Sequence, residues 1–168
     1  MDFRAPIFEM PDLAQCVRVW RAAGKSVALC HGRFDPLHVG HILHFEEART
    51  LADVLVVTIT ADAYAQSARG RPFLPEHHRA ISVASQRSVS GVAISNTSGA
   101  VPILEVIQPD IYVKGQDYVG SAHQGYLEEV HCANELGIRV CTTTSEKFSA
   151  TNLLRKITDE MHENGVSS

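Results

Sequence analysis

The chain has 168 residues, of which 45% are hydrophobic and 20% charged, and its formal net charge is −4 at pH 7. This length fits a single globular domain, and the composition excludes a disordered or collagen-like chain. The lack of a basic stripe argues against nucleic acid as a partner, and no apolar run approaches the ~20 residues of a membrane span. The opening residues lack the basic region and apolar core of a signal peptide, so we expect a cytoplasmic protein.

Apolar runs alternate with helical patterns along the whole sequence. In chain order, they predict a helix at about 11–23, a strand at 26–30, a helix at 39–51, a strand at 54–60, a helix at 76–86, a strand at 91–95, a helix near 101–107, a strand at 109–114, a helix at 122–136, a strand at 138–143 and a last helix from 149 to about 162. This alternation predicts a Rossmann-like three-layer α/β/α fold with a five-stranded parallel sheet. We expect one domain over residues 1–168, with a frayed tail after about residue 163.

The cysteines and four of the nine histidines are not expected to take part in chemistry. The four cysteines show no C-x-x-C spacing, so we interpret them as free thiols. A histidine metal centre would need ligands converging from separate loops. The histidines expected to be uninvolved, because they fall in solvated helices, are His77, His78, His123 and His131. The role of His31 is left open.

The first predicted strand is followed by the segment HGRFDPLHVGH, residues 31–41. In α/β folds, ligands bind beyond the carboxyl ends of the strands. His38 and His41 are three apart at a predicted helix N-terminus, so they share one face where main-chain N–H groups favour an anion. Gly32 allows close backbone approach, and Gly40 leaves room for a bulky group. Such donors suit a phosphoryl-type transition state, although surface histidines without function are the alternative.

Three stretches together resemble the cytidylyltransferase-like group of nucleotidyltransferases, whose signature is H-x-G-H. Besides 31–41, residues 70–72 followed by Arg79 resemble the G-R-P…R stretch of heptose 1-phosphate adenylyltransferases. Residues 109–118, PDIYVKGQDY, are similar to their K-P-D-x-x-V-K-G-x-D-Y. The resemblance covers nearly the whole chain. It implies transfer of a nucleotidyl group from ATP or CTP to a small phosphate ester, with release of pyrophosphate.

The resemblance also implies residue roles. His38 and His41 would be catalytic, contacting the triphosphate and stabilising the transition state. The residues implied to bind the nucleotide are Gly32, Arg33, Phe34, Gly40, Arg79, Lys114, Ser149 and Thr151. The residues implied to face the acceptor are Asp35, Asp62, Arg71, Arg87 and Asp117. Asp35 could instead order its loop, and Asp62 could be a simple helix cap. Mg²⁺ would accompany the nucleotide, held mostly by water and phosphate oxygens rather than by protein.

The sequence departs from the heptose enzymes at two places. Ser67 stands where they carry a lysine, and Ser149-Ala150-Thr151 replaces their S-T-T. Arg87 matches an arginine of glycerol-3-phosphate cytidylyltransferases, whereas Thr144 stands where those enzymes carry another. A sugar phosphate is therefore the expected acceptor and a polyol phosphate with CTP the alternative. Less favoured are a non-catalytic nucleotide-binding module and a fragment of a class I aminoacyl-tRNA synthetase. The resemblance also implies a homodimer.

Overall fold

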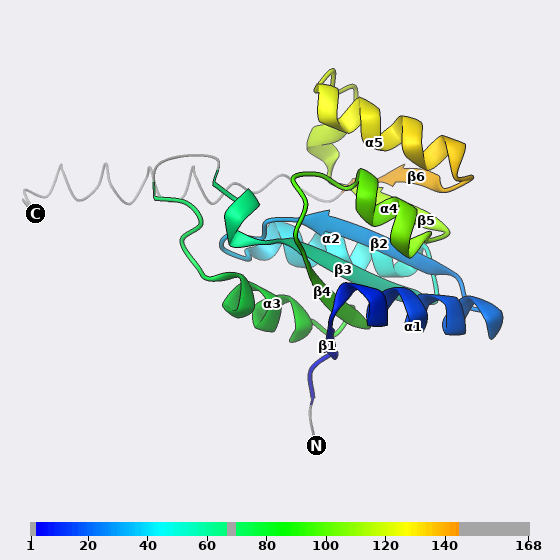
Figure 1. The fold of residues 1–168 in the computed structure, drawn as a ribbon, viewed down its shortest axis with the longest axis horizontal. Helices are drawn as coiled ribbons and strands as arrows, with labels where there is room; N and C mark the ends of the chain where they lie inside the picture. Colours follow the sequence, from blue (N-terminus) through cyan, green and yellow to red (C-terminus); the bar gives the residue numbers. More distant parts are fainter. Residues whose placement is uncertain (1–2, 67–69, 145–168) are drawn as a thin grey trace, which may run out of the picture.

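The computed structural model describes residues 3–66 and 70–144 of the chain. Its centre is a six-stranded sheet in which every pairing is parallel, in the order β1-β4-β3-β2-β5-β6 (Figure 1). The strands are β1 (Ile7–Phe8), β2 (Val27–Gly32), β3 (Val54–Thr60), β4 (Gly91–Ser95), β5 (Ile111–Lys114) and β6 (Arg139–Thr142). The helices are α1 (Met10–Ala22), α2 (Val39–Thr50), α3 (Glu76–Ala84), α4 (Val101–Ile107) and α5 (Gln124–Glu135). Among the described residues, no helix is long and apolar enough to cross a membrane.

The predicted Rossmann-like α/β architecture is confirmed, with one correction to the strand count. The sheet has a sixth strand, β1, which pairs with β4 through Ile7 and Phe8. Two residues between prolines are too short to show a strand periodicity, so the sequence pattern did not reveal this edge strand. All five predicted strands and the helices up to α5 are present within a few residues of their expected bounds. The last predicted helix, from 149 to about 162, lies outside the described residues.

The sheet separates two apolar cores, because successive side chains of a strand point to opposite faces. In β2, Val27 and Leu29 pack with α1, α4 and α5, whereas Ala28 and Cys30 pack with α2 and α3. The β3 strand alternates in the same way and is buried over its whole length. The result is the predicted three-layer arrangement, with the sheet in the middle (Figure 1).

The strand order fixes where a ligand would bind. From β2 the chain proceeds outward to β3 and β4, and then crosses back to place β5 on the other side of β2. The strand order therefore reverses between β2 and β5. In doubly wound folds the binding crevice opens at such a point, beyond the carboxyl ends of the strands. Residues 33–38 follow β2 there, and residues 115–117 follow β5.

Candidate active site

The two motif histidines meet at the N-terminus of α2. His38 is the N-cap, and its extended main chain donates an N–H to Nδ1 of His41 at 3.4 Å, within a reciprocal capping box. The two imidazole rings are stacked, with centroids 3.6 Å apart and an interplanar angle of 18°. Because Nδ1 of His41 accepts, the proton of the neutral ring is on Nε2. The structure thus brings together the two residues predicted to be catalytic.

These imidazoles are uncharged near neutral pH. Burial, together with the neighbouring His38 and His44, lowers the pKa of His41 to about 3. Burial also lowers the pKa of His44 to about 4, although Glu47 and Asp117 act in the opposite direction. The pKa of His38 is lowered for the same main reason, burial. Each ring can therefore offer one N–H donor to an anion, whose charge would raise these pKa values again.

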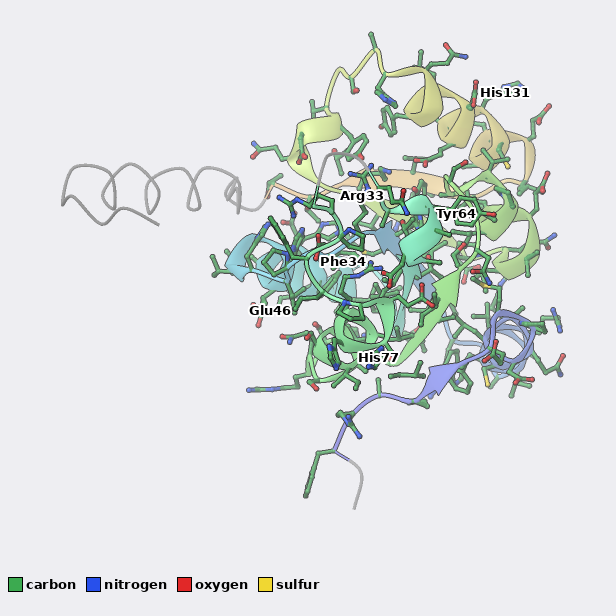
Figure 2. All side chains as sticks on the ribbon, turned by 60° about the vertical axis from the view of Figure 1, so that its left-hand side comes forward. Arg33, Phe34, Glu46, Tyr64, His77 and His131 are labelled. Carbon is green, nitrogen blue, oxygen red and sulfur yellow. The ribbon has the colours of Figure 1, made fainter. Side chains whose placement is uncertain are left out.

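The Phe34 side chain packs against His41 of the histidine pair. Its backbone has a φ of 52°, in the left-handed region, which is uncommon for a bulky residue. The ring meets the His41 ring edge-on at 5.1 Å between centroids and packs against Phe45 at the same separation. A Cβ on Gly32 would lie 3.0 Å from the tip of this ring, so a larger residue there would require the Phe34 ring to shift by a few tenths of an ångström. Arg33, its neighbour in the chain, is exposed (Figure 2).

Asp35 orders a loop, which is one of the two roles predicted for it. Its carboxylate accepts the main-chain N–H groups of Phe73, at 2.8 and 2.9 Å, and of Leu74, at 2.9 Å. Arg71 forms an ion pair with it at 3.2 Å and also donates to the Asp35 carbonyl. Burial acts to raise the pKa of Asp35, but the bonds from Phe73, Leu74 and Arg71 outweigh it, so the pKa is lowered. The carboxylate is thus held ionised by the protein itself.

Arg79 is completely buried and joins three segments near the site. Its guanidinium donates to the carbonyls of Arg33, at 2.6 Å, and Leu74, at 2.9 Å. It also pairs with Asp62 at 2.6 Å, and the carboxylate of Asp62 is 42% exposed. The structure therefore places Arg79 behind the loops that follow β2 and β3, with its donors directed to protein groups. The contact of Arg79 with the phosphates stays a prediction.

Lys114 lies in a buried polar network at the end of β5. Its ammonium contacts Glu129 of α5 at 2.8 Å and the Tyr112 hydroxyl at 3.1 Å, and it lies 3.9 Å from the centroid of the Tyr118 ring. Burial acts to raise the pKa of Glu129, but Lys114, Tyr112 and the N–H of Ala100 lower it overall. Sequence reasoning predicted Lys114 and missed Glu129. A lysine ending the apolar run IYVK was the available signal, because a buried ammonium needs a partner.

The side chain of His31, a residue whose role the sequence did not decide, connects β2 to β3. Its Nδ1 lies 3.0 Å from the Thr58 hydroxyl and its Nε2 lies 3.4 Å from the Thr60 hydroxyl. Burial, and then the charge of Lys114, lower its pKa to about 4. Both ring nitrogens are therefore engaged by the neighbouring strand, and His31 contributes to the floor beneath the crevice.

The end of β6 is held by α2 through residues to which no motif assigned a role. Nδ1 of His44 lies 2.8 Å from the Thr143 hydroxyl. The Glu47 carboxylate accepts the main-chain N–H of Thr144, at 2.8 and 3.0 Å, and its hydroxyl at 3.1 Å. Asp117, after β5, is exposed and near enough to His44 for its charge to act on that imidazole.

The remaining predicted residues divide by position. Gly40 is the second residue of α2 and lies between the motif histidines. Arg87 is exposed and precedes β4, so it lies at the amino ends of the strands, away from the crevice. Ser149 and Thr151, together with Ser67, fall outside the described residues.

The other histidines and the cysteines make no observed contact with the motif histidines His38 and His41 among the described residues. His131 is exposed on α5 and pairs with Glu135 at 3.5 Å, far from Arg33 (Figure 2). The rings of His77 and His78 lie against each other at 4.1 Å. All four cysteines have free thiols, as interpreted from their spacing. Within residues 3–66 and 70–144, no group of three or more His, Cys, Asp or Glu side chains could hold a metal ion.

Comparison with known proteins agrees with this geometry. The family model described as cytidylyltransferase-like matches residues 29–168. The chain is 35% identical to the "Bifunctional protein HldE" of Geotalea uraniireducens over 159 residues, which are 93% of this chain and 32% of that protein. It is 33% identical to the protein of the same name from Koribacter versatilis over 155 residues, 91% of this chain and 31% of that protein. The chain belongs to the cytidylyltransferase-like family of nucleotidyltransferases.

A solved structure shows the same fold. It is the crystal structure of "the lipopolysaccharide core biosynthesis protein" from Thermoplasma volcanium GSS1, with a TM-score of 0.61 and 25% identity. The match covers 75% of this chain and 100% of that one. By contrast, the chain spans about a third of the length of the two curated relatives.

Proposed function

We propose that the protein transfers a nucleotidyl group from ATP or CTP to a sugar phosphate and releases pyrophosphate. One observation carries this proposal: two stacked, neutral histidines lie at the N-terminus of α2, beside the reversal of strand order. A helix N-terminus and uncharged imidazole donors stabilise the phosphate charge that develops in transfer. Both histidines of the family motif are present and meet, which argues against the alternative of a non-catalytic module.

The reaction needs no protein nucleophile. An oxygen of the acceptor phosphate attacks the α-phosphorus of the nucleotide, and the bond from that phosphorus to the bridging oxygen breaks. Pyrophosphate leaves with the electron pair of that bond. His38 and His41 donate N–H groups to the triphosphate oxygens during this in-line displacement.

Mg²⁺ is part of the proposal as the companion of the nucleotide. Mg²⁺ usually keeps several waters and binds through substrate phosphates, so we expect phosphate oxygens and water to hold most of its coordination. When bound, the ion would neutralise triphosphate charge. The chain's own contribution is then to orient the phosphates with His38 and His41, while Asp35 holds the 71–74 segment in place.

For the acceptor, a sugar 1-phosphate of the heptose type is favoured. The G-R-P stretch that suggested it includes Arg71, which pairs with Asp35, a residue of the same motif segment as His38 and His41. The alternative, a polyol phosphate with CTP, depended on Arg87, and that residue lies at the opposite ends of the strands. The names of the relatives, which include a lipopolysaccharide core biosynthesis protein, agree with a sugar substrate.

The test is pyrophosphate release with each nucleoside triphosphate against a panel of sugar 1-phosphates and polyol phosphates, with Mg²⁺. We expect release with one nucleotide and a heptose-type 1-phosphate. Release only with a polyol phosphate would shift the acceptor class, and release with no pair would overturn the proposal. Light scattering of the same sample tests the proposed homodimer.

A further inference from the structure

We propose that Tyr118 is a positioning residue: its ring, held by the buried Lys114 ammonium, keeps the Asp117 carboxylate over the end of β5, where it accepts a hydroxyl group of the acceptor substrate. The inference rests on the proposed function, in which Asp117 is predicted to face the acceptor. It deepens that function, because it names the chemical group that Asp117 would bind. It also gives Tyr118 a role that neither the motif nor the family resemblance supplied.

The anchor of this arrangement is a buried ammonium that is held from several directions. Lys114 is the last residue of β5, and its side chain is only 6% exposed. The ammonium donates to Glu129 of α5 at 2.8 Å and to the Tyr112 hydroxyl at 3.1 Å, and this hydroxyl donates to Glu129 at 2.9 Å. Glu129 also accepts the main-chain N–H of Ala100, the N-cap of α4, at 3.2 Å. Because a strand and two helices meet in this network, the ammonium occupies a fixed place.

The Tyr118 ring packs on this ammonium. Lys114 Nζ lies 3.9 Å from the centroid of the Tyr118 ring, compared with 5.3 Å for Tyr112 and 5.9 Å for Tyr126. The negative face of an aromatic ring attracts an ammonium within about 6 Å of its centroid, and more strongly where water is excluded. The Tyr118 ring also contacts the Tyr126 ring of α5, with centroids 5.1 Å apart. Side chains of β5 and α5 therefore hold Tyr118 together.

A short turn transmits the place of this ring to Asp117. Residues Gln116–Tyr118 form one 3-10 turn directly after β5, in which the Tyr118 N–H donates to the Gly115 carbonyl at 3.1 Å. The Asp117 carboxylate lies over Gly115, since a Cβ added there would be 3.0 Å from Oδ1 of Asp117. The carboxylate is thus at the end of β5, beside the reversal of strand order. Because Asp117 adjoins Tyr118 in so short a turn, displacing the ring would displace the carboxylate.

The position of Asp117 suits a contact with the acceptor. Asp117 is exposed, and it is near enough to α2 for its charge to act on His44, three residues after the motif residue His41. An ionised carboxylate accepts hydrogen bonds and donates none, so it binds the hydroxyl groups of a sugar phosphate rather than its phosphate. Tyr118 then determines where such a hydroxyl group is held relative to the motif histidines.

The experiment is a double-mutant cycle between Tyr118→Leu and Asp117→Asn, with Tyr118→Phe as the conservative variant. The matched control is Val119→Ala, at the next residue, whose side chain is 65% exposed. For each variant, pyrophosphate release gives kcat and the KM of the nucleotide and of the phosphate acceptor that the wild type uses, and the Tm reports folding. If Tyr118→Leu does not fold, Tyr118→Met takes its place in the cycle, because the flexible methionine side chain fills irregular space.

We expect Asp117→Asn and Tyr118→Leu each to raise the acceptor KM roughly tenfold or more, as for the loss of a hydrogen bond to a charged group, and to leave the nucleotide KM within about twofold. The double mutant should match Asp117→Asn within about twofold, because Tyr118 acts through Asp117. Tyr118→Phe retains the ring face and should match the wild type, as should Val119→Ala.

Other results separate the possible failures. Additive losses in the double mutant would show that Tyr118 does not act through Asp117 and would overturn the inference. An unchanged acceptor KM in a folded Tyr118→Leu protein would overturn it too, and either result leaves the proposed function standing. A fall in Tm with equal losses of affinity for both substrates would show a merely structural role and also overturn it. A wild type that releases no pyrophosphate overturns the proposed function together with this inference.

Discussion

At the scale of single residues, the most important property of the site is that the imidazoles of His38 and His41 are uncharged. His38 and His41 are stacked too closely for two imidazolium ions, and burial keeps both rings uncharged. The His38 N–H holds Nδ1 of His41 as an acceptor, which leaves Nε2–H as the donor. The local backbone thus fixes the tautomer that a phosphate oxygen needs.

Replacing His41 with alanine should abolish most of the activity without unfolding the protein. The variant loses a donor that acts in the transition state, so we expect kcat to fall by at least about a hundredfold, or roughly 3 kcal/mol in activation free energy. Steady-state pyrophosphate release measures this, with circular dichroism to confirm the fold. His131→Ala, on the exposed face of α5, is the control and should retain wild-type turnover. A His41→Ala protein with most of its activity would refute the catalytic role.

The buried pair of Lys114 and Glu129 makes a prediction about stability. Glu129→Ala leaves the Lys114 ammonium buried with only the Tyr112 hydroxyl and aromatic rings beside it. Breaking one side of a buried pair costs about 3–5 kcal/mol, so the free energy of unfolding should fall by about that amount. Urea denaturation measures it. Glu128→Ala, one residue earlier and exposed, should change stability by less than about 1 kcal/mol. Equal losses in the two variants would contradict the network.

At the scale of elements, the site is assembled from loops rather than from helices and strands alone. Arg79 joins the loop after β2 to the loop before α3 and to Asp62 after β3. The Asp35 carboxylate, in the loop after β2, accepts main-chain N–H groups of the 71–74 segment. The family resemblance predicted that Arg79 contacts the phosphates and that Asp35 either faces the acceptor or orders its loop. The tertiary structure uses them to hold loops.

Arg79→Lys separates these two interpretations. A lysine retains the charge but lacks the planar fork that reaches three acceptors, so buried carbonyls lose their donors. We expect the free energy of unfolding to fall by about 2–4 kcal/mol, with the nucleotide KM changing less than threefold at a temperature where the variant is folded. Denaturation and steady-state kinetics on the same sample measure both. A stable variant with a strongly raised nucleotide KM would instead support direct phosphate contact. Arg87→Lys, exposed before β4, is the control.

At the scale of the whole molecule, three histidines with lowered pKa values lie at the carboxyl end of β2 and in the first half of α2. His31, His41 and His44 come from β2 and α2 and have pKa values of about 4, 3 and 4. Their ordinary value in an unfolded chain is about 6.5. These three histidines are therefore protonated less readily in the folded chain than in the unfolded chain.

This difference predicts a loss of stability in mild acid. Below pH 6.5 the unfolded chain takes up protons that the folded chain excludes, so the free energy of unfolding falls as the pH falls from about 6.5 toward 4. The stabilisation is fully present above pH 6.5. Calorimetric Tm values measured across this range should drop steeply, and His44→Gln should reduce the slope because it removes one such group. A Tm that is flat between pH 7 and pH 4.5 would contradict the burial of these rings.

The sequence by itself determined the parallel α/β fold, its element order and the histidine motif. Hydrophobic periodicity is local, and so is the strand–loop–helix context of residues 31–41, so both can be seen without tertiary contacts. The two-residue strand β1 was missed because it is too short to have a period. Only the tertiary structure showed that Arg79, Asp35 and Lys114 contact protein groups, that Glu129 pairs with Lys114, and that His44 and Glu47 contact Thr143 and Thr144. The partners of these residues lie up to 99 positions away in the sequence. Burial shifts the pKa of a side chain and makes an unpaired charge costly, and burial exists only in the folded chain.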